Sequence, residues 1–176
     1  MKNLLFLIGY RGSGKTTVAR IVAAQMGWDW LDNDQVLEER YGKTIRQIFA
    51  EEGEPGFRDK ESAVLTSLCQ RDRLVLATGG GVILRPENRA ILRGGFVVWL
   101  TASAEVLYER IHGDATTTER RPNLAGGGIE EVREMLKVRE PLYRECAHLV
   151  VDAEANSPAE IAARITNEPG VKRLRE

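Results

Sequence analysis

Residues 9–16, Gly-Tyr-Arg-Gly-Ser-Gly-Lys-Thr, fit the pattern G-x-x-x-x-G-K-[ST], the clearest chemical signal in the sequence. Glycines in such a segment let successive backbone N–H groups point inward, where they can donate to phosphate oxygens. Lys15 can then reach the β- and γ-phosphates of a nucleotide, and the Thr16 hydroxyl can bind Mg²⁺. A simple tight turn would need only one or two glycines and no Lys-Thr pair. The pattern therefore predicts a P-loop that binds a nucleotide.

Two carboxylates, Asp32 and Asp34, follow a short extended segment and stand two positions apart. In an extended backbone such side chains project to the same side, so one could serve a metal and the other a hydroxyl. The alternative is that Asn33 or Asp34 only caps the following helix. The apolar run at residues 74–78 contains no Asp of the kind that often holds Mg²⁺ in P-loop proteins. We therefore assign Asp32 to Mg²⁺, through water.

Three consecutive glycines at residues 79–81 follow that apolar run. Such a run costs conformational entropy, which favours close approach of a ligand to the backbone, with an awkward turn as the alternative. Residues 113–128 are rich in Thr, Arg, Pro and Gly and include Arg121, which favours a lid that brings positive charge to a phosphoryl group. Arg58 and Arg139 have acidic neighbours in sequence, and a solvated salt bridge is the default interpretation of each.

The elements that must position these residues alternate between strand and helix. Short apolar runs predict strands at residues 3–9, 28–31, 74–78, 96–100 and 148–151. Helical spacing or helix signals predict helices at residues 15–26, 86–92, 104–111, 129–146 and 158–165. Two further helical stretches are separated at Gly42. A turn at Pro55-Gly56 then precedes a helix whose core face is formed by Ala63, Val64, Leu65 and Leu68. Strands in this alternation form a parallel sheet with helices on both faces, and ligands gather at the carboxyl ends of its strands.

Composition limits the function further. The chain has 176 residues, 43% of them hydrophobic, and a net charge of −1, which predicts one domain spanning residues 1–176. Balanced charge argues against a partner such as nucleic acid or an anionic membrane. The apolar run at residues 4–8 is far shorter than the ~18 residues of a membrane span, so we expect a cytoplasmic protein, with monomer as the default. Cys69 and Cys146 fit neither a zinc nor a disulfide pattern.

Together these motifs resemble the shikimate kinase family over residues 3–165, in the order and spacing of that family. The resemblance is carried by the P-loop, Asp32 and Asp34, Gly56-Phe57-Arg58 with Glu61, the glycines at 79–81, Arg121-Pro122, and Arg139 before Pro141-Leu142-Tyr143. It implies an α/β fold like that of nucleoside monophosphate kinases: a P-loop three-layer sandwich with a five-stranded parallel sheet in the order 2-3-1-4-5. A substrate-binding region about residues 33–61 and a mobile lid about residues 113–128 are also implied.

The resemblance further implies transfer of the γ-phosphoryl of ATP to the 3-hydroxyl of shikimate, a step toward chorismate and the aromatic amino acids, with Mg²⁺. The implied substrate contacts are Asp34 to the ring hydroxyls, also as base, Arg58 and Arg139 to the carboxylate, and Gly79, Gly80 and Gly81 through backbone N–H. The implied nucleotide and metal contacts are Gly12, Ser13, Gly14, Lys15, Thr16 and Thr17 at the phosphates, Lys15 and Arg121 at the transferring phosphoryl, Arg110 and Pro158 beside the adenine, and Thr16 and Asp32 at Mg²⁺. Arg120 adjoins Arg121, and the Arg-Pro pairing favours the latter.

Two other functions remain open at this stage. Another small-molecule P-loop kinase, for gluconate or a nucleoside monophosphate, would need different anchors for its acceptor. Asp34, Arg58 and Arg139 suit one carboxylate with several hydroxyls better than a phosphate. A non-enzymatic nucleotide switch has less support, because the sequence contains no Asn-Lys-x-Asp motif for reading guanine.

Overall fold

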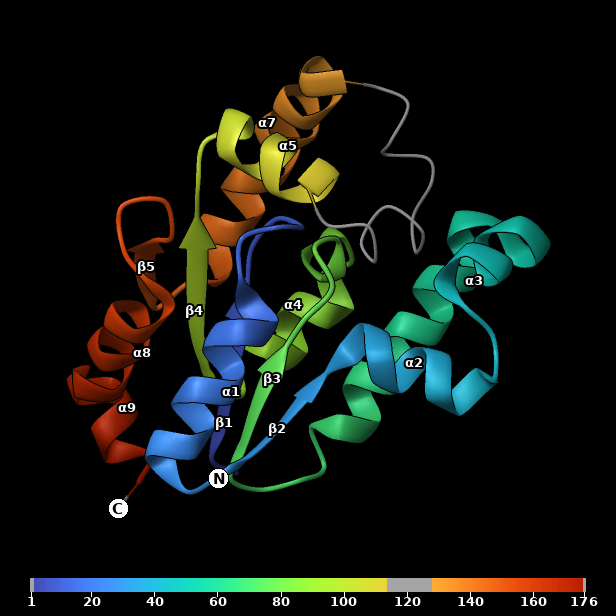
Figure 1. Cartoon of the computed structure of the whole chain (residues 1–176). Coiled ribbons are helices and arrows are strands. Elements are labelled where there is room, and N and C mark those ends of the chain that lie inside the picture. Colours follow the sequence, from blue (N-terminus) through green and yellow to red (C-terminus); the bar gives the residue numbers. More distant parts are fainter. Residues whose placement is uncertain (1, 114–127, 176) are drawn as a thin grey trace.

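The computed structural model describes residues 2–113 and 128–175, and a parallel sheet forms its centre (Figure 1). The strands are β1 (Leu4–Ile8), β2 (Asp29–Asp32), β3 (Leu74–Ala77), β4 (Phe96–Thr101) and β5 (Leu149–Asp152). Within the described residues the sheet has five strands in the order β2-β3-β1-β4-β5, so the implied topology is confirmed. Every residue of β1 and β3 is buried, as expected of central parallel strands that are covered on both faces.

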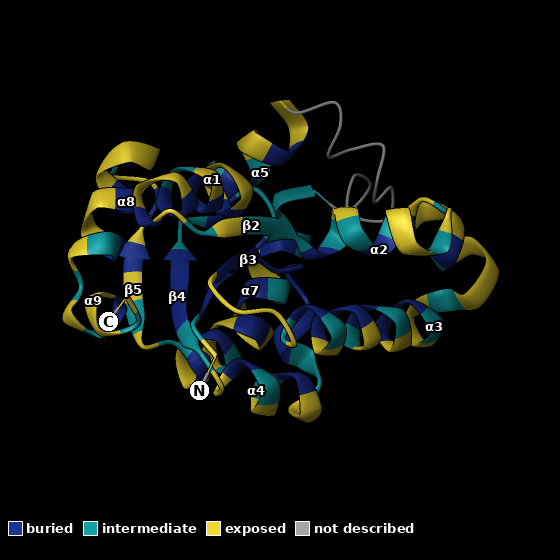
Figure 2. Cartoon of the chain, turned by 90° about the horizontal axis from the view of Figure 1, so that it is seen from below, coloured by how far each residue is buried: buried dark blue, intermediate teal, exposed yellow. Residues whose placement is uncertain are grey.

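Helices cover both faces of the sheet (Figure 2). They are α1 (Lys15–Met26), α2 (Asn33–Tyr41), α3 (Ile45–Leu68), α4 (Pro86–Leu92), α5 (Ala104–Gly113), α7 (Gly128–Cys146), α8 (Pro158–Asn167) and α9 (Pro169–Arg173), with a 3₁₀ turn η1 (Val82–Leu84). Alternate β1 residues divide between two cores: Leu4 and Phe6 pack with α3, α4 and α7, whereas Leu5 and Leu7 pack with α1 and α8. The period of two along an extended strand produces this division.

The segment between β2 and β3 folds into two helices, as the break at Gly42 predicts. Gly42 ends α2 with φ +62°, and Thr44 begins α3 with a capping box that involves Gln47. The turn expected at Pro55-Gly56 lies earlier, because Gly53 carries the non-helical backbone (φ +68°) that kinks α3. Pro55 sits just after the kink, where a missing N–H costs little. Ala63, expected on the core face, is exposed, and buried Phe57 and Glu61 occupy that face instead.

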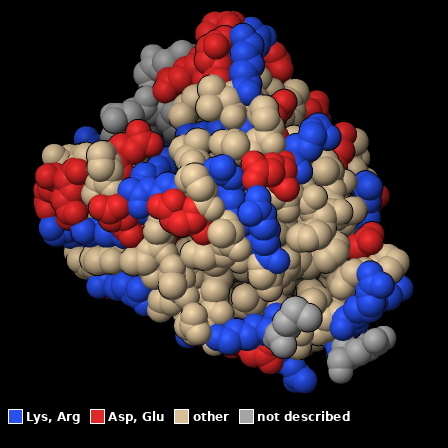
Figure 3. Space-filling model, turned by 180° about the vertical axis from the view of Figure 1, so that it is seen from behind, with Lys and Arg blue, Asp and Glu red and all other residues tan. Residues whose placement is uncertain are grey.

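The expected lid lies almost entirely outside the described residues. Gly113 ends α5 and Gly128 begins α7, while Arg120 and Arg121 fall between them in the part that is not described. No helix in the described ranges is both long and apolar enough to cross a membrane. Figure 3 shows acidic and basic side chains interspersed on the rear face of the molecule. The short helix α9 and the turn η1 were not predicted from the sequence.

Candidate active site

The P-loop connects β1 to α1 at the carboxyl end of the sheet, as predicted. All three of its glycines have a positive φ that favours glycine: +141° at Gly9, +82° at Gly12 and +89° at Gly14. A Cβ atom at Gly9 would also lie 2.5 Å from the Leu100 carbonyl oxygen of β4. Gly14 is the N-cap of α1 and offers no side-chain hydrogen bond, so the first N–H groups of the helix remain available to an anion.

Lys15 lies against the inside of this loop. Its side chain is buried, and its Nζ donates to the carbonyl oxygens of Gly9 at 2.9 Å and Tyr10 at 2.8 Å. These two carbonyl oxygens therefore hold the ammonium group against the loop whose N–H groups would bind phosphate. Ser13 is also buried, whereas Thr16 and Thr17 are exposed on the first turn of α1. This local geometry is what the sequence pattern predicts for a phosphate site.

Asp32 links β2 to both neighbouring helices. One carboxylate oxygen accepts from the Thr16 hydroxyl at 2.6 Å, and the other accepts from the backbone N–H groups of Asp34 and Gln35. Asp32 is thus the N-cap of α2, so the alternative in which Asn33 or Asp34 caps the helix is wrong. Asp34 already belongs to the first helical turn rather than to an extended strand. The two acids therefore do not share an extended backbone.

The charge of Asp34 nevertheless acts on Asp32. Burial, followed by the negative charge of Asp34, raises the pKa of Asp32, while the Thr16 hydroxyl, the Gln35 N–H and Lys15 oppose the rise. A hydroxyl and a carboxylate oxygen are hard donors of the kind that Mg²⁺ prefers. In the ranges 2–113 and 128–175, no group of three or more His, Cys, Asp or Glu side chains could hold a metal ion. Thr16 and Asp32 therefore fit a magnesium ion that takes its other ligands from phosphate and water.

Arg58 of α3 is buried, with 6% of the residue exposed. Its Nη1 lies 2.7 Å from Glu61 Oε2, which belongs to a completely buried residue, and its Nη2 lies 3.2 Å from Glu54 Oε1. Both partners are acidic neighbours in sequence, as expected, but the expectation of a solvated surface pair is wrong. Burial lowers the pKa of Arg58, and the charges and hydrogen bonds of Glu61 and Glu54 outweigh it, so the pKa is raised overall. The guanidinium group is held in one place by its acidic partners.

Arg139 of α7 is equally buried, at 6% exposed, but its surroundings differ. Its guanidinium carbon lies 5.3 Å from the ring centroid of Tyr10 in the P-loop, a cation–π contact. No carboxylate in the described part of the chain forms a salt bridge with it, so the expected surface pair is wrong here too. Within the described residues an aromatic ring and no carboxylate lies against this buried cation, so its charge is available to bind an anion.

The glycines at residues 79–81 bring the two arginines together. A Cβ atom at Gly81 would lie 2.4 Å from Arg58 Nη2, and one at Gly80 would lie 3.6 Å from Arg139 Nη1 and 3.3 Å from the Arg11 backbone nitrogen. Close approach of a ligand to this backbone stays a prediction, and the protein groups that approach it are the two guanidinium groups and the P-loop. Among the described residues, no acceptor takes up the N–H groups of residues 79–81. These amides and both arginines therefore form a cluster of donors.

Arg110 and Pro158, the residues assigned to the adenine, both lie near the segment that follows β5. Arg110 of α5 donates to the Gly12 carbonyl at 3.4 Å and to the Ala153 carbonyl, after β5, at 2.9 Å. Pro158 is the first residue of α8, behind the Ser157 capping box. The P-loop is thus tied to the segment that follows β5.

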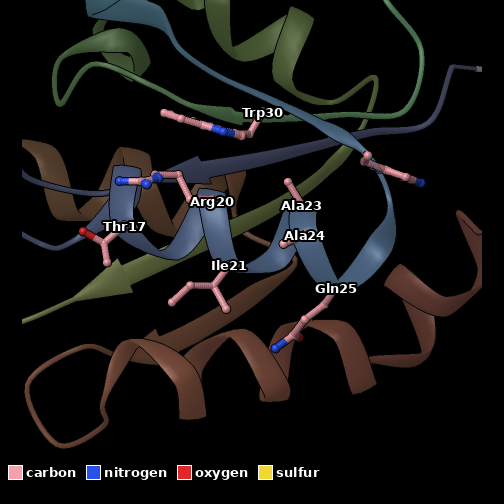
Figure 4. A pocket seen from close by; sticks show the side chains of 8 residues that line it. Thr17, Arg20, Ile21, Ala23, Ala24, Gln25 and Trp30 are labelled. Carbon is pink, nitrogen blue, oxygen red and sulfur yellow. The ribbon is translucent and has the colours of Figure 1, made fainter.

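Thr17 also lines a separate hollow on the outer side of α1 (Figure 4). Arg20 reaches over the Trp30 ring there, at 5.6 Å from the centroid. This hollow contains none of the residues assigned to the acceptor.

No role was predicted for Tyr10, and Glu61 entered only as an acidic neighbour that follows Arg58 in sequence. Glu61 lies three residues after Arg58 on one helix, a spacing at which side chains meet, and this was the available signal. Nothing in the local sequence connects Tyr10 with Arg139, because they meet only when α7 packs beside the P-loop.

Comparisons with known proteins agree with this geometry. The family model described as shikimate kinase matches residues 11–168. A shikimate kinase of Rhodopirellula baltica is 44% identical over 163 residues, covering 92% of this chain and 87% of that protein. A shikimate kinase of Pseudomonas savastanoi pv. phaseolicola is 43% identical over 175 residues, covering 96% and 99%.

Solved structures show the same relationship. The shikimate kinase of Acinetobacter baumannii in complex with shikimate has a TM-score of 0.87 and 40% identity, covering 94% of this chain and 91% of that chain. A gluconokinase of Sinorhizobium meliloti, with a TM-score of 0.59 and 20% identity, covering 98% and 93%, shares only the fold. With a family match across most of its length and relatives above 40% identity, this chain belongs to the shikimate kinase family.

Proposed function

We propose that this protein transfers the γ-phosphoryl group of ATP to the 3-hydroxyl of shikimate, giving shikimate 3-phosphate and ADP, in the pathway to chorismate and the aromatic amino acids. The observation that carries the proposal is the donor cluster beside the P-loop: Arg58, Arg139 and the amides of residues 79–81, which bond to no acceptor within residues 2–113 and 128–175. Shikimate has one carboxylate and several hydroxyls. A pair of guanidinium groups binds the carboxylate, while Asp34 accepts hydrogen bonds from hydroxyls.

The proposed chemistry needs few protein groups. The shikimate 3-hydroxyl gives its proton to the Asp34 carboxylate as its oxygen bonds to the γ-phosphorus. The bond from that phosphorus to the β–γ bridging oxygen breaks, and ADP leaves with the electron pair. Lys15 and the amides of the P-loop stabilise the negative charge on the transferring group, which is the main task of protein in such reactions. Arg121, outside the described residues, is expected to add positive charge there.

The residues that would hold Mg²⁺ are Thr16 and Asp32, whose oxygens already lie 2.6 Å apart. Bound there, Mg²⁺ would supply positive charge that offsets the negative charge of the nucleotide phosphates. The nucleotide phosphates would contact Gly12, Ser13, Gly14, Lys15, Thr16 and Thr17, which all belong to the P-loop and the first turn of α1. Arg110 and Pro158 would flank the adenine, since both lie beside the segment after β5. A monomer in the cytoplasm completes the proposal.

A coupled ADP-release assay with four acceptor conditions tests the function. Shikimate, gluconate, AMP and buffer alone are compared at equal ATP and Mg²⁺. Only shikimate should raise ADP release above the rate without acceptor. Gluconate is included because a gluconokinase shares the fold of this chain. Release that rises with gluconate or AMP but stays at background with shikimate would overturn the proposal, and release equal in all four conditions would favour a nucleotide switch.

A further inference from the structure

Tyr143 lies one helical turn after Arg139 on α7 and has no role in the function proposed above. The residue is completely buried, and its ring stacks on Trp99 with the centroids 5.6 Å apart. Its hydroxyl donates a hydrogen bond to the backbone carbonyl of Gly80. Buried tyrosines usually find a partner for the hydroxyl, but this partner belongs to the turn assigned to the acceptor.

This hydrogen bond orients one particular peptide unit. The Gly80 carbonyl and the Gly81 N–H belong to the same planar trans unit, so they point in opposite directions. By holding the carbonyl, Tyr143 fixes the direction of the N–H on the other side of the turn. No acceptor in the described part of the chain takes up that N–H. Within the described residues, the Gly81 N–H is therefore oriented without donating a hydrogen bond to the protein.

The turn needs such a constraint because glycine is the most permissive residue in φ and ψ. The carbonyls on either side are held by backbone: Gly79 accepts from the Val82 N–H at 3.1 Å, and Gly81 accepts from the Leu84 N–H at 3.0 Å. The Gly80 carbonyl between them is held by the Tyr143 side chain. Loss of the hydroxyl would leave the middle peptide unit free to rotate.

We propose that Tyr143 is a positioning residue that aims the Gly81 N–H at the bound acceptor. The inference rests on the proposed function, in which shikimate lies beside residues 79–81. Residues four apart lie on one face of a helix, so α7 presents Arg139 and Tyr143 to the same turn. Arg139 Nη1 would lie 3.6 Å from a Cβ at Gly80, which places the two groups together. Helix α7 thus supplies the Arg139 guanidinium group and, through Tyr143, fixes the direction of the Gly81 N–H.

Tyr143→Phe tests this inference, because it removes the hydroxyl and keeps the ring that stacks on Trp99. We expect the KM for shikimate to rise by about 10-fold, equivalent to about 1.4 kcal/mol, while the KM for ATP changes less than about twofold. Tyr108→Phe is the matched control, since it removes the hydroxyl of a tyrosine whose ring lies against His112 on α5 and which is assigned to neither substrate. Leu142→Ala is the stability control, because Leu142 packs on the core from α7 and its truncation loosens that packing. Both controls should keep the normal ratio of the two KM values.

A shikimate KM that is unchanged in Tyr143→Phe, although Arg139→Ala raises it, would overturn the inference and leave the proposed function intact. Equal changes in both KM values, as general loosening would give, would also overturn it. If the unmodified enzyme releases no ADP with shikimate, the proposed function itself fails. A measurement without substitution guards against misfolding: the ¹⁵N-labelled Gly81 amide resonance should shift on addition of shikimate alone. An unshifted resonance in saturated protein would contradict the proposal.

Discussion

Gly81→Ala should weaken shikimate binding by displacing Arg58. The Gly81 backbone has φ −101° and ψ 7°, a conformation open to alanine, so the substitution adds no backbone strain. Its Cβ would lie 2.4, 2.5 and 2.6 Å from Nη2, Nη1 and Cζ of Arg58, whereas ordinary contact begins at 3.4 Å. The guanidinium group must therefore move by about 1 Å, more than a good hydrogen bond tolerates.

The size of the effect follows from the bonds that this movement breaks. Arg58 is 6% exposed and is held by Glu61 at 2.7 Å, so it cannot shift without losing geometry. A hydrogen bond to a charged group contributes about 1.5 to 3 kcal/mol, which corresponds to about a 10- to 150-fold rise in the shikimate KM. Initial rates from the coupled ADP assay, with each substrate varied in turn, give both KM values. The KM for ATP should stay near that of the unmodified enzyme.

A double-mutant cycle isolates the cause. The second background carries Arg58→Ala together with Glu61→Gln, because a buried carboxylate without its partner would destabilise the fold. In that background the clashing atoms are absent, so Gly81→Ala should add almost nothing to the shikimate KM. If the alanine raises the KM by the same factor in both backgrounds, it acts on the acceptor directly, and the reasoning about Arg58 is refuted.

Three further outcomes are expected. Asp34→Asn should lower kcat by about 10²-fold while ADP affinity in a calorimetric titration stays the same; an equal loss of nucleotide affinity would contradict the role of Asp34 at the acceptor. Arg139→Ala should raise the shikimate KM by about 10- to 150-fold and leave the ATP KM unchanged. An unchanged shikimate KM would show that Arg139 does not bind the acceptor. Burial raises the pKa of Cys69 from 9.0 to about 11, so this thiol favours folding below pH 9.0, and that contribution disappears as the pH rises to about 11. Urea unfolding should accordingly show a larger loss of stability over this interval for the unmodified protein than for Cys69→Ser, and identical losses would rule the thiol out.

The P-loop and the sheet could be predicted because their signals are local. The glycine spacing with the Lys-Thr pair determines the turn before α1, and apolar runs separated by helices determine a parallel sheet. The bounds of α1 and α4 agree with the prediction because a glycine precedes α1 and a proline begins α4. The kink in α3 was misplaced because Pro55-Gly56 reads as a turn, although the positive φ of Gly53 produces it.

The surroundings of the two arginines could not be predicted from nearby residues. Acidic neighbours favoured surface pairs for both, but burial depends on which helices pack over the glycine turn. Arg139 contacts Tyr10, from the far end of the chain, and this contact exists only in the folded protein. The capping role of Asp32 was missed for a related reason, since its carboxylate serves both Thr16 and the start of α2. The resemblance to a family assigned these residues without knowledge of the packing, whereas the physical reasons for their roles could be given only from the folded structure.

A crystal structure of the unmodified enzyme with shikimate and ADP examines the proposed site most directly. The account predicts that the shikimate carboxylate lies between the guanidinium groups of Arg58 and Arg139, with the 3-hydroxyl within hydrogen-bond distance of Asp34 and directed toward the β-phosphate side of the P-loop. A shikimate molecule bound elsewhere, with its carboxylate away from both arginines, would contradict it.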